Sequence, residues 1–509
     1  MKLEDIFSHS MFWRKPVQDI HADLAGRPSL KRVLRPVDLV IMGIGAIIGT
    51  GVFVLSGIAG TMAGNALPLS FIIAGVACLF AALCYAEFAA MIPVAGSAYT
   101  YCYTALGEIW AWIIGWDLVL EYGLAISAVA IGWSGYFSTL LASCGFLLPP
   151  TLSHPFGTDG GIINLPAVII VLCLTLLLIN GTKKSAAMNA VIVVIKIAVI
   201  LLFIILGAGA IQPGNWQPFL PPTGIFGVIS GAAIVFFAFI GFDAVVTAAE
   251  EIENPQKNLP IGIIGSLVIC MILYVIVGFV LTGIVPWTML SAPDALNAPI
   301  AFALDFINVP WGAALVSIGA ICGMTSVLLV MIFGQSRILF AMSRDGLVPA
   351  AFSEVHPTTH TPANVTLFTG IITAIIAGFF PLTIVAELVN IGTLVAFLIV
   401  ALGVIVLRYK QPALARPFRC PCVPVIPLLC IGFCLLLIFH LNTLAHQLFV
   451  VWLFIGLVVY FLYGIRNSRN RANGVIGLAE PIPCKINPET PFTGFSDLGV
   501  HDIRADPDK

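Results

Sequence analysis

The chain has 509 residues, of which 60% are hydrophobic and only 9% are charged. Soluble globular domains carry about 25% charged residues, so this chain has too few charges to cover its own surface in water. The mean hydropathy of +1.06 indicates that lipid surrounds most of it. The formal net charge of −2 is too small to argue for a nucleic-acid partner, and none is expected.

Apolar runs set the order of the predicted elements, because a membrane helix needs about 20 apolar residues. The fold class we expect is an all-α integral membrane protein with twelve spans, at 37–62, 67–92, 108–143, 163–181, 187–211, 224–252, 258–285, 311–342, 362–380, 384–408, 424–443 and 446–464. Four regions follow: an N-terminal segment 1–36, a ten-helix core 37–408, a loop with the last two helices at 409–464, and a polar tail 465–509.

Positive charges give the expected orientation, since cytoplasmic loops carry the excess of lysine and arginine. Basic residues follow the even-numbered helices, at Lys183, Lys184, Lys257, Arg337, Arg344, Arg408, Lys410, Arg416 and Arg419. The loops after odd-numbered helices carry none. Both termini are therefore expected in the cytoplasm, on an even number of spans in the cell membrane. Lys196 is the exception, because it lies inside the fifth span.

The first span is rich in glycine, with Gly43, Gly45, Gly49 and Gly51. Each glycine costs a helix interior about 1 kcal/mol relative to alanine. Residues 49–51 lie roughly 18 Å into the span at 1.5 Å per residue, and unwound backbone at that depth is tolerated only beside a buried or wet cavity. The alternative is that the glycines simply allow close helix packing.

The sixth span has a matching interruption at Gly241 and Asp243. Because spans 1 and 6 are five apart, the pattern predicts an inverted repeat of helices 1–5 and 6–10, with a binding site between the two broken helices. Helices 11 and 12 then lie outside the repeat.

Broken helices present unpaired backbone groups in mid-membrane. A restarted helix offers N–H groups that suit a carboxylate, and a terminated helix offers carbonyls that suit an ammonium. A site with both suits a zwitterion, which is an amino acid. The carboxylate is expected on the N–H groups near Thr50 and Gly51, and the ammonium on carbonyls near Ile47, Phe239 and Ile240. The predicted backbone site comprises Ile47, Ile48, Gly49, Thr50, Gly51, Phe239, Ile240 and Gly241, with Asp243 beside it.

Several long segments resemble a known family. They are IGAIIGTGVFVLSG, ALCYAEFAAMIPVAGSAYTY, FFAFIGFDAVVTAAEEIENPQKNLPIGI, GQSRILFAMSRDGLVP and RPFRCP. Together they resemble the amino acid–polyamine–organocation superfamily, and within it the bacterial relatives of the cationic amino acid transporters. The resemblance covers residues 30–465. It implies the LeuT-type five-plus-five repeat, alternating access, amino acid substrates and, typically for this branch, coupling to protons.

Lys196 is a functional hypothesis because ionisable residues are rare within spans. It lies roughly 13 Å into its helix, where reaching the interface is the alternative. In sodium-coupled relatives of the fold a sodium ion bridges helices 1 and 8. By that resemblance the lysine ammonium would occupy the same place, with Thr325, Ser326 and carbonyls near Gly43 and Ile44 as partners, and would couple transport to protons.

Three of the acids in the predicted spans are candidates for a functional role. Asp243 is interpreted either as a partner of the substrate ammonium or gate, or as the N-cap of the restarted half-helix. Asp117 and Glu121 are four residues apart and share a helix face. They would either relay protons, a role assigned to Glu121 with Lys196, or bind buried hydroxyls and orient the lysine, and the second role is favoured.

The side-chain pocket is expected from helices 6, 7 and 8. The predicted aromatic gates are Phe236 and Phe242, with Phe239 beside them, and the predicted lining residues are Tyr274, Met324 and Thr325. A bulky Met324 leaves no counter-charge for a cationic side chain. Small neutral amino acids are therefore favoured over cationic ones.

Other classes of protein fit less well. An enzyme would need clustered ligands or a nucleophile with its base, and a channel would show a filter loop or charge rings. We expect no catalytic residues, metal or cofactor. The open alternatives are an amino acid exchanger, a sodium symporter and a non-transporting amino acid sensor. The expected partners are the amino acid, protons and membrane lipid, and a small single-helix subunit is an open question.

Overall fold

The computed structural model describes residues 34–92, 97–158, 160–180, 186–354 and 361–468. Within these ranges the regular structure is helical, apart from two isolated β-bridges, Leu34 with Ile252 and Pro155 with Ile162. The predicted N-terminal segment and C-terminal tail lie almost entirely outside the described residues, as do Lys183 and Lys184.

Seven helical stretches within the described residues are long and apolar enough to cross a membrane: Gly51–Met91, α7 (Glu108–Ser143), Ala190–Ala208 within α10 (Ala186–Ala208), α12 (Pro255–Ile284), α15 (Pro310–Arg344), α17 (Leu382–Lys410) and Thr443–Asn467, which begins with α19 (Thr443–Val459). Five shorter apolar stretches accompany them: α3 (Pro36–Ile47), α9 (Leu165–Ile179), Ile225–Phe239, α16 (Ala363–Phe379) and α18 (Val425–Phe439). Each predicted span coincides with one of these stretches or with two of them in sequence, and a count of twelve crossings stays a prediction.

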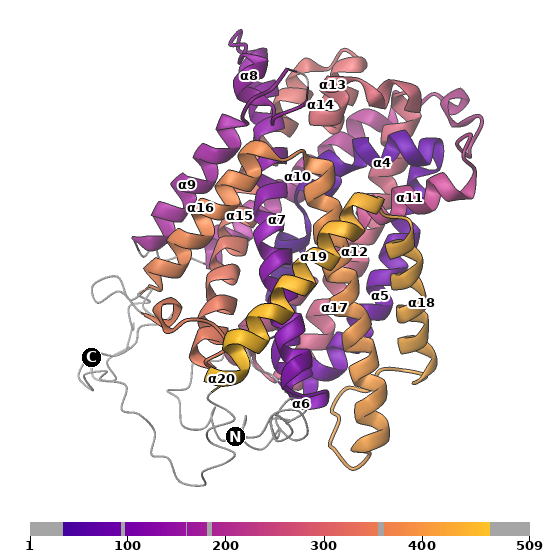
Figure 1. Ribbon diagram of the computed structural model, residues 1–509. Coiled ribbons are helices and arrows are strands. Elements are labelled where there is room, and N and C mark those ends of the chain that lie inside the picture. Colours follow the sequence, from indigo (N-terminus) through magenta and orange to yellow (C-terminus); the bar gives the residue numbers. More distant parts are fainter. Residues whose placement is uncertain (1–33, 93–96, 159, 181–185, 355–360, 469–509) are drawn as a thin grey trace, which may run out of the picture.

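A short turn separates the first two predicted spans, as expected from their bounds at 62 and 67. Helix α4 (Ser56–Ala63) runs through one 3₁₀ turn, Gly64–Ala66, directly into α5 (Leu67–Met91). Short helices that the hydropathy pattern did not predict also appear, namely α6 (Ser97–Ala105), α8 (Pro150–Ser153), α13 (Pro293–Asn297) and α14 (Pro299–Phe306). Figure 1 places α8, α13 and α14 together at one end of the bundle and α6 at the other.

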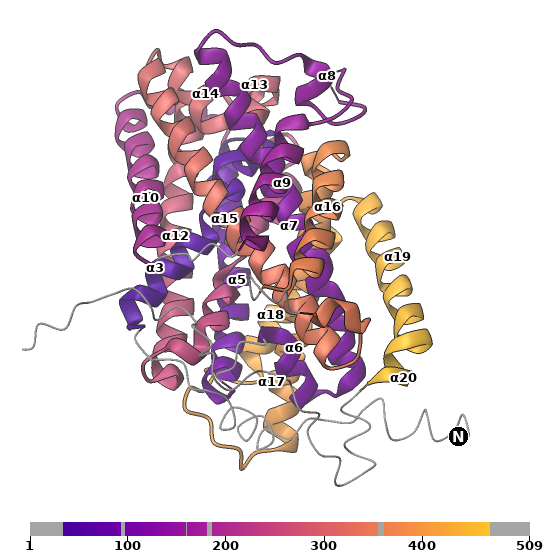
Figure 2. The same cartoon turned by 90° about the vertical axis from the view of Figure 1, so that its left-hand side faces the viewer.

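Helix packing follows a regular pattern. Helix α4 packs on α11 (Ile225–Val235), α5 on α12, α7 on α15, and α9 on α16. In the numbering of the predicted spans, each partner lies five helices later. Small residues allow these close approaches: Ala74, Ala77 and Ala81 of α5 are fully buried. Helix α19 lies at the edge of the bundle (Figure 2), outside the paired helices.

Large apolar side chains point outward from the bundle. Ile205 on α10 is 70% exposed and Phe454 on α19 is 67% exposed. Water would make such an apolar surface costly, whereas lipid does not. The exposed apolar surface therefore agrees with a multi-pass membrane protein.

Candidate functional site

The first helix is interrupted where its glycines lie. Helix α3 ends at Ile47, and Ile48 and Gly49 are not helical. A π-helical turn, Gly51–Leu55, then restarts the chain and continues into α4. Unlike a regular helix, this segment leaves backbone groups unpaired at the middle of the bundle.

The sixth helix is interrupted opposite the first. Helix α11 passes into a 3₁₀ turn, Phe236–Phe239, and a second 3₁₀ segment runs from Phe242 to Glu251. Between them Gly241 has φ of 111°, which favours glycine. A Cβ atom on Gly241 would lie 2.9 Å from the carbonyl oxygen of Ala46, so the two interruptions touch.

Two glycines of helix 1 allow close packing against neighbouring segments, and one of them, Gly51, also begins the π-helical turn. A Cβ on Gly51 would lie 2.1 Å from the Cα of Ala238 in the helix 6 interruption, and one on Gly43 would lie 2.4 Å from the hydroxyl of Ser266. Real Cβ atoms do not approach other atoms so closely. The alternative interpretation of the glycines therefore holds at these two positions.

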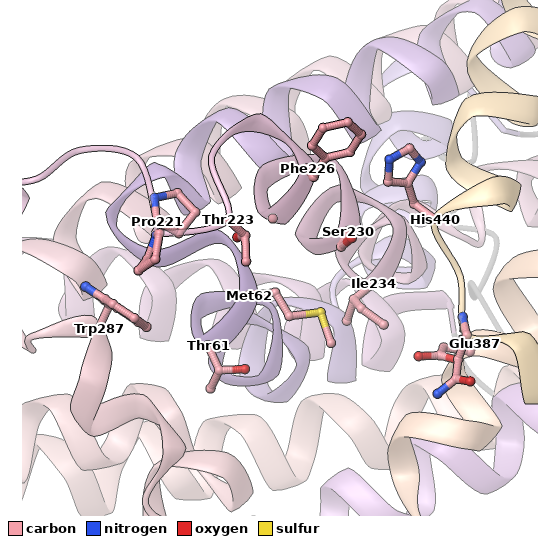
Figure 3. Close-up of a pocket in the computed structure, with 13 residues that line it drawn as sticks. Thr61, Met62, Pro221, Thr223, Phe226, Ser230, Ile234, Trp287, Glu387 and His440 are labelled. Carbon is pink, nitrogen blue, oxygen red and sulfur yellow. Dashed lines mark hydrogen bonds between the residues drawn. The ribbon is translucent and has the colours of Figure 1, made fainter.

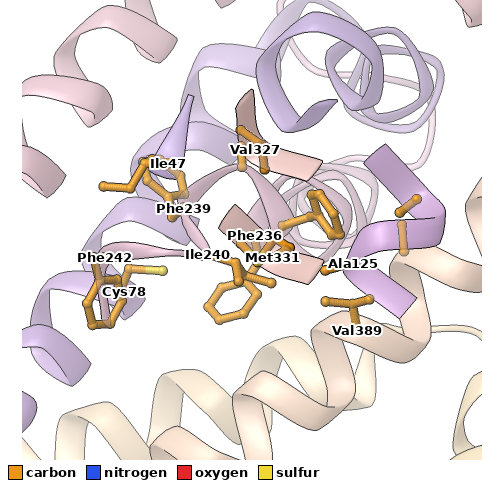
Figure 4. Close-up of a cluster of buried hydrophobic side chains, with 14 of the residues drawn as sticks. Ile47, Cys78, Ala125, Phe236, Phe239, Ile240, Phe242, Val327, Met331 and Val389 are labelled. Carbon is orange, nitrogen blue, oxygen red and sulfur yellow. The ribbon is translucent and has the colours of Figure 1, made fainter. Parts of the chain in front are cut away.

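A small cavity of about 20 Å³ lies between the two interruptions. The backbone of helix 1 lines it at Ile47, Gly49, Thr50 and Gly51, and helix 6 contributes Ile240. The other lining residues were not predicted: Ala46, Ala125, Val129, Phe237, Val327 and Met331. Figure 4 shows Ala125, Val327 and Met331 around the same region as Ile47 and Ile240. These missed residues are ordinary apolar members of apolar spans, so no sequence signal distinguishes them.

Side chains from two neighbouring helices bind the carbonyls at the end of α3. The fully buried Lys196 donates through Nζ to the carbonyl oxygens of Gly45 at 2.7 Å and Ile48 at 3.0 Å. Tyr274 on α12 donates to the carbonyl of Ile47 at 3.2 Å. The lysine thus bonds to helix 1 as predicted, although to Gly45 and Ile48 instead of Gly43 and Ile44.

A glycine on helix α15 leaves room for the side chain of Lys196. A Cβ on Gly323 would lie 3.0 Å from Cε and Cγ of Lys196. Thr325, expected to bind the lysine and to line the pocket, instead donates to the carbonyl of Ile321 at 2.8 Å and accepts from the indole of Trp133 at 3.0 Å. The aliphatic stem of Lys196 crosses α15 at Gly323, and its ammonium thereby reaches the backbone oxygens of helix 1.

Met324 contacts the cavity indirectly. The hydroxyl of Thr50, which lines the cavity, lies 3.3 Å from the sulfur of Met324, and both residues are fully buried. A thioether sulfur is a weak acceptor, so this contact mainly fixes the side chain of Thr50.

The acids Asp243, Glu121 and Asp117 do not make the contacts that the simplest sequence-based predictions gave them. Gly241 holds the N-cap position of the second helix 6 segment, so the N-cap interpretation of Asp243 is wrong. Asp243 accepts from the hydroxyl of Tyr122 at 3.4 Å. Glu121 has Asp243, Asp117 and Thr393 as neighbours.

Asp117 is almost completely buried on α7, at 1% exposure. Neither of its carboxyl oxygens has a hydrogen-bond partner within the part of the chain that the structure describes. The hydrogen bonds of Lys196 go to backbone carbonyls and to neither acid of α7. The part of the favoured interpretation in which these acids orient the lysine therefore finds no support in the geometry.

The aromatic residues predicted as gates pack on other helices. Phe236 and Phe242 contact the ring of Phe397 on α17, with centroids 5.8 and 5.3 Å apart. Phe239 packs on Tyr274 at 5.3 Å. Phe237 is the helix 6 aromatic residue that lines the cavity, because the 3₁₀ turn rotates the side chains relative to a continuous α-helix.

A second buried charge cluster lies far from the cavity. Glu87 on α5 accepts from Arg408 at 2.9 and 2.7 Å and from the backbone N–H of Cys420 at 2.7 Å, and it forms an ion pair with Arg416 at 3.2 Å. These contacts fasten the loop after α17 to α5, next to the basic residues that the orientation rule places in the cytoplasm.

Comparison with known proteins covers this whole helical region. Residues 34–465 match the family described as amino acid permease. The branched-chain amino acid permease BcaP of Bacillus subtilis is 52% identical over 463 residues, which cover 90% of this chain and 99% of the relative. The methylthioribose transporter of the same organism is 49% identical over 461 residues, with the same coverage. The vacuolar cationic amino acid transporter 4 of Arabidopsis thaliana is 39% identical over 412 residues, which cover 79% of this chain and 68% of the relative.

Proposed function

The chain belongs to the amino acid permease family, and from that premise we propose that it carries a neutral, apolar amino acid across the cell membrane in symport with protons. Membership confirms the resemblance to the amino acid–polyamine–organocation superfamily. Transport by this chain, its substrate, its coupling ion and a cytoplasmic location of both termini are parts of the proposal.

The observation that carries the proposal is the pair of facing interruptions. The restarted helix 1 begins with the N–H groups of Thr50 and Gly51 beside the cavity, and the first N–H groups of a helix have no partner within it. They would bind the substrate carboxylate. The helix 6 interruption ends a 3₁₀ turn at Phe239 and Ile240, whose carbonyls would bind the ammonium.

The lining favours a neutral, apolar side chain. Among the described residues, the cavity wall beyond the backbone site consists of Ala46, Ala125, Val129, Phe237, Val327 and Met331, with no charged side chain. A cationic side chain would lie there without a counter-charge, which is costly. The name of the branched-chain permease from Bacillus subtilis agrees with this preference.

The packing pattern supports alternating access. Helices that lie five apart in the predicted numbering pack on each other in four pairs, as expected for a five-plus-five inverted repeat in which one half rocks against the other. A cavity of about 20 Å³ is too small for an amino acid, so the structure corresponds to a closed form that must open on one side to bind substrate.

Lys196 supports proton coupling rather than sodium coupling. Its ammonium bonds two carbonyls at the helix 1 interruption beside helix 8, where the resemblance places sodium in sodium-coupled relatives. Because desolvation disfavours a charged amine, proton release from Lys196 would free these carbonyls and loosen the interruption. Glu121 and its neighbour Asp243 are the proposed acids of the proton path.

The test is uptake into liposomes that contain the purified protein, with and without an inward proton gradient and without sodium. The panel holds labelled leucine, alanine, lysine and methylthioribose. Gradient-stimulated leucine uptake is expected, with little lysine uptake. Leucine counterflow that ignores the gradient would replace symport by exchange, and binding without counterflow would leave a sensor. Uptake of methylthioribose alone would overturn the amino acid assignment.

A further inference from the structure

A larger cavity lies apart from the central site. It has a volume of about 590 Å³ and opens among the end of α4, the start of α11, the start of α17 and the connection between α18 and α19. These helix ends are opposite to the end of α17 that carries Arg408. Pockets that bind small organic molecules typically measure about 300–1,000 Å³, so the size suits such a ligand.

One wall of this cavity holds a buried carboxylate. Glu387 on α17 is only 7% exposed. Within the described residues it accepts a long hydrogen bond, 3.3 Å, from the backbone N–H of Asn442 to Oε2, and His446 lies near it. Figure 3 shows Glu387 at one end of the cavity, below His440. A buried carboxylate is costly unless cations or several donors compensate it, and this one faces open space.

The rest of the wall is largely apolar. Hydrophobic and aromatic surface comes from Met62, Phe226, Ile234 and Trp287. Ser230 adds a hydroxyl group. Aromatic faces and a carboxylate both attract an organic cation. Among the described residues, no lysine or arginine lines the cavity to pair with Glu387, and His440 is the basic side chain in its wall.

We propose that this cavity is a second binding site, which takes a primary ammonium group on a compact apolar body and pairs the ammonium with Glu387. Either a free small amine or the amine headgroup of a phospholipid supplies that chemistry. The proposal rests on the cavity and its carboxylate and does not depend on what the central site carries.

The cavity adjoins the helix 6 interruption. Asn390, one turn after Glu387 on α17, donates to the carbonyl oxygens of Ala233 at 2.7 Å and Ile234 at 3.2 Å. Those two carbonyls belong to the last turn of α11, just before the 3₁₀ turn that carries Phe237. An occupant held by Glu387 therefore contacts the same helix end that forms one side of the central cavity.

The test uses the full chain in phosphatidylcholine nanodiscs and radiolabelled 2-phenylethylamine, with 3-phenylpropionate as a probe of similar body and opposite charge. Saturable binding of the amine is expected, and none of the acid. Glu387→Gln should weaken binding by about tenfold or more, since it removes a charge-assisted hydrogen bond. Ser230→Phe should weaken binding by narrowing the cavity while it leaves the carboxylate in place. Glu354→Gln, on an exposed carboxylate that accepts from Asn364, is the matched control.

The possible results distinguish the proposal from its alternatives. Binding unchanged in both Glu387→Gln and Ser230→Phe, or equal binding of 3-phenylpropionate, would overturn the proposal. Loss of binding in nanodiscs that contain phosphatidylethanolamine would identify the lipid headgroup as the occupant, and retained binding would identify a free amine. Thermal unfolding of each variant shows whether it is folded. A wild-type protein that binds the amine but takes up no amino acid would contradict the proposed function alone.

Discussion

Gly51 and Gly49 are expected to respond in opposite ways to alanine. A Cβ on Gly51 would lie 2.1 Å from the Cα and 2.7 Å from the N of Ala238, which are backbone atoms that cannot rotate away. Carbon atoms in contact prefer about 3.5–4.0 Å, so the two helix interruptions would have to separate by roughly 1.5 Å. At Gly49 the nearest atom is Cγ2 of Val327 at 3.4 Å, which is an ordinary contact with a side chain.

The cost of Gly51→Ala falls on the closed form. Overpacking in a well-packed core typically costs about 1–3 kcal/mol, and each 1.4 kcal/mol is a factor of ten. The closed form should therefore be roughly 5- to 150-fold less populated relative to open forms. Because substrate must pass through the closed form, initial uptake should fall by a similar factor, whereas Gly49→Ala should stay within about twofold of wild type.

The assay is initial leucine uptake into liposomes with equal amounts of each variant, together with thermal unfolding in detergent as a folding control. Uptake by Gly51→Ala close to wild type would refute the argument from close packing. Equal damage from both substitutions would show that flexibility at the interruption matters, and that the contact with Ala238 does not.

Three further predictions follow from the hydrogen bonds. Lys196→Ala should abolish uptake driven by a proton gradient while leucine counterflow persists, and unchanged gradient-driven uptake would remove the lysine from coupling. Glu87→Gln should lower the free energy of unfolding by about 3–5 kcal/mol, because the buried Arg416 and the partly buried Arg408 lose their anion, and an unshifted melting temperature would contradict this. Tyr274→Phe should cost about 1 kcal/mol through its lost bond to Ile47. Measured stability equal to wild type would show that this bond contributes nothing.

The two helix interruptions were predictable because their causes are local. Glycine destabilises helix wherever it lies, and Gly49 and Gly241 stand in otherwise apolar spans. The backbone part of the candidate site follows from these positions, whereas the contact between Lys196 and helix 1 was expected from the family resemblance. The family resemblance was also visible in the sequence, because long segments around these interruptions carry it.

The side-chain part of the site was not predictable. Phe237 lines the cavity while Phe236 and Phe242 pack on Phe397, and all three are equally apolar in the sequence. In a soluble protein the buried face of a helix is marked by its apolar stripe. In lipid both faces are apolar, so the periodicity does not report how each helix is rotated.

By itself, then, the sequence determined what depends on composition and on single positions: a lipid-embedded helical chain, the places of its spans, two interrupted helices and a lysine inside the fifth span. The tertiary structure decided everything that depends on helix rotation and crossing. It decided that Gly51 packs on Ala238, that Gly45 and Ile48 receive Lys196, and that Glu387 faces a separate cavity. The physical reason is that packing between apolar helices is set by complementary shape. This complementarity depends on the surfaces of two helices together and cannot be read from either segment alone.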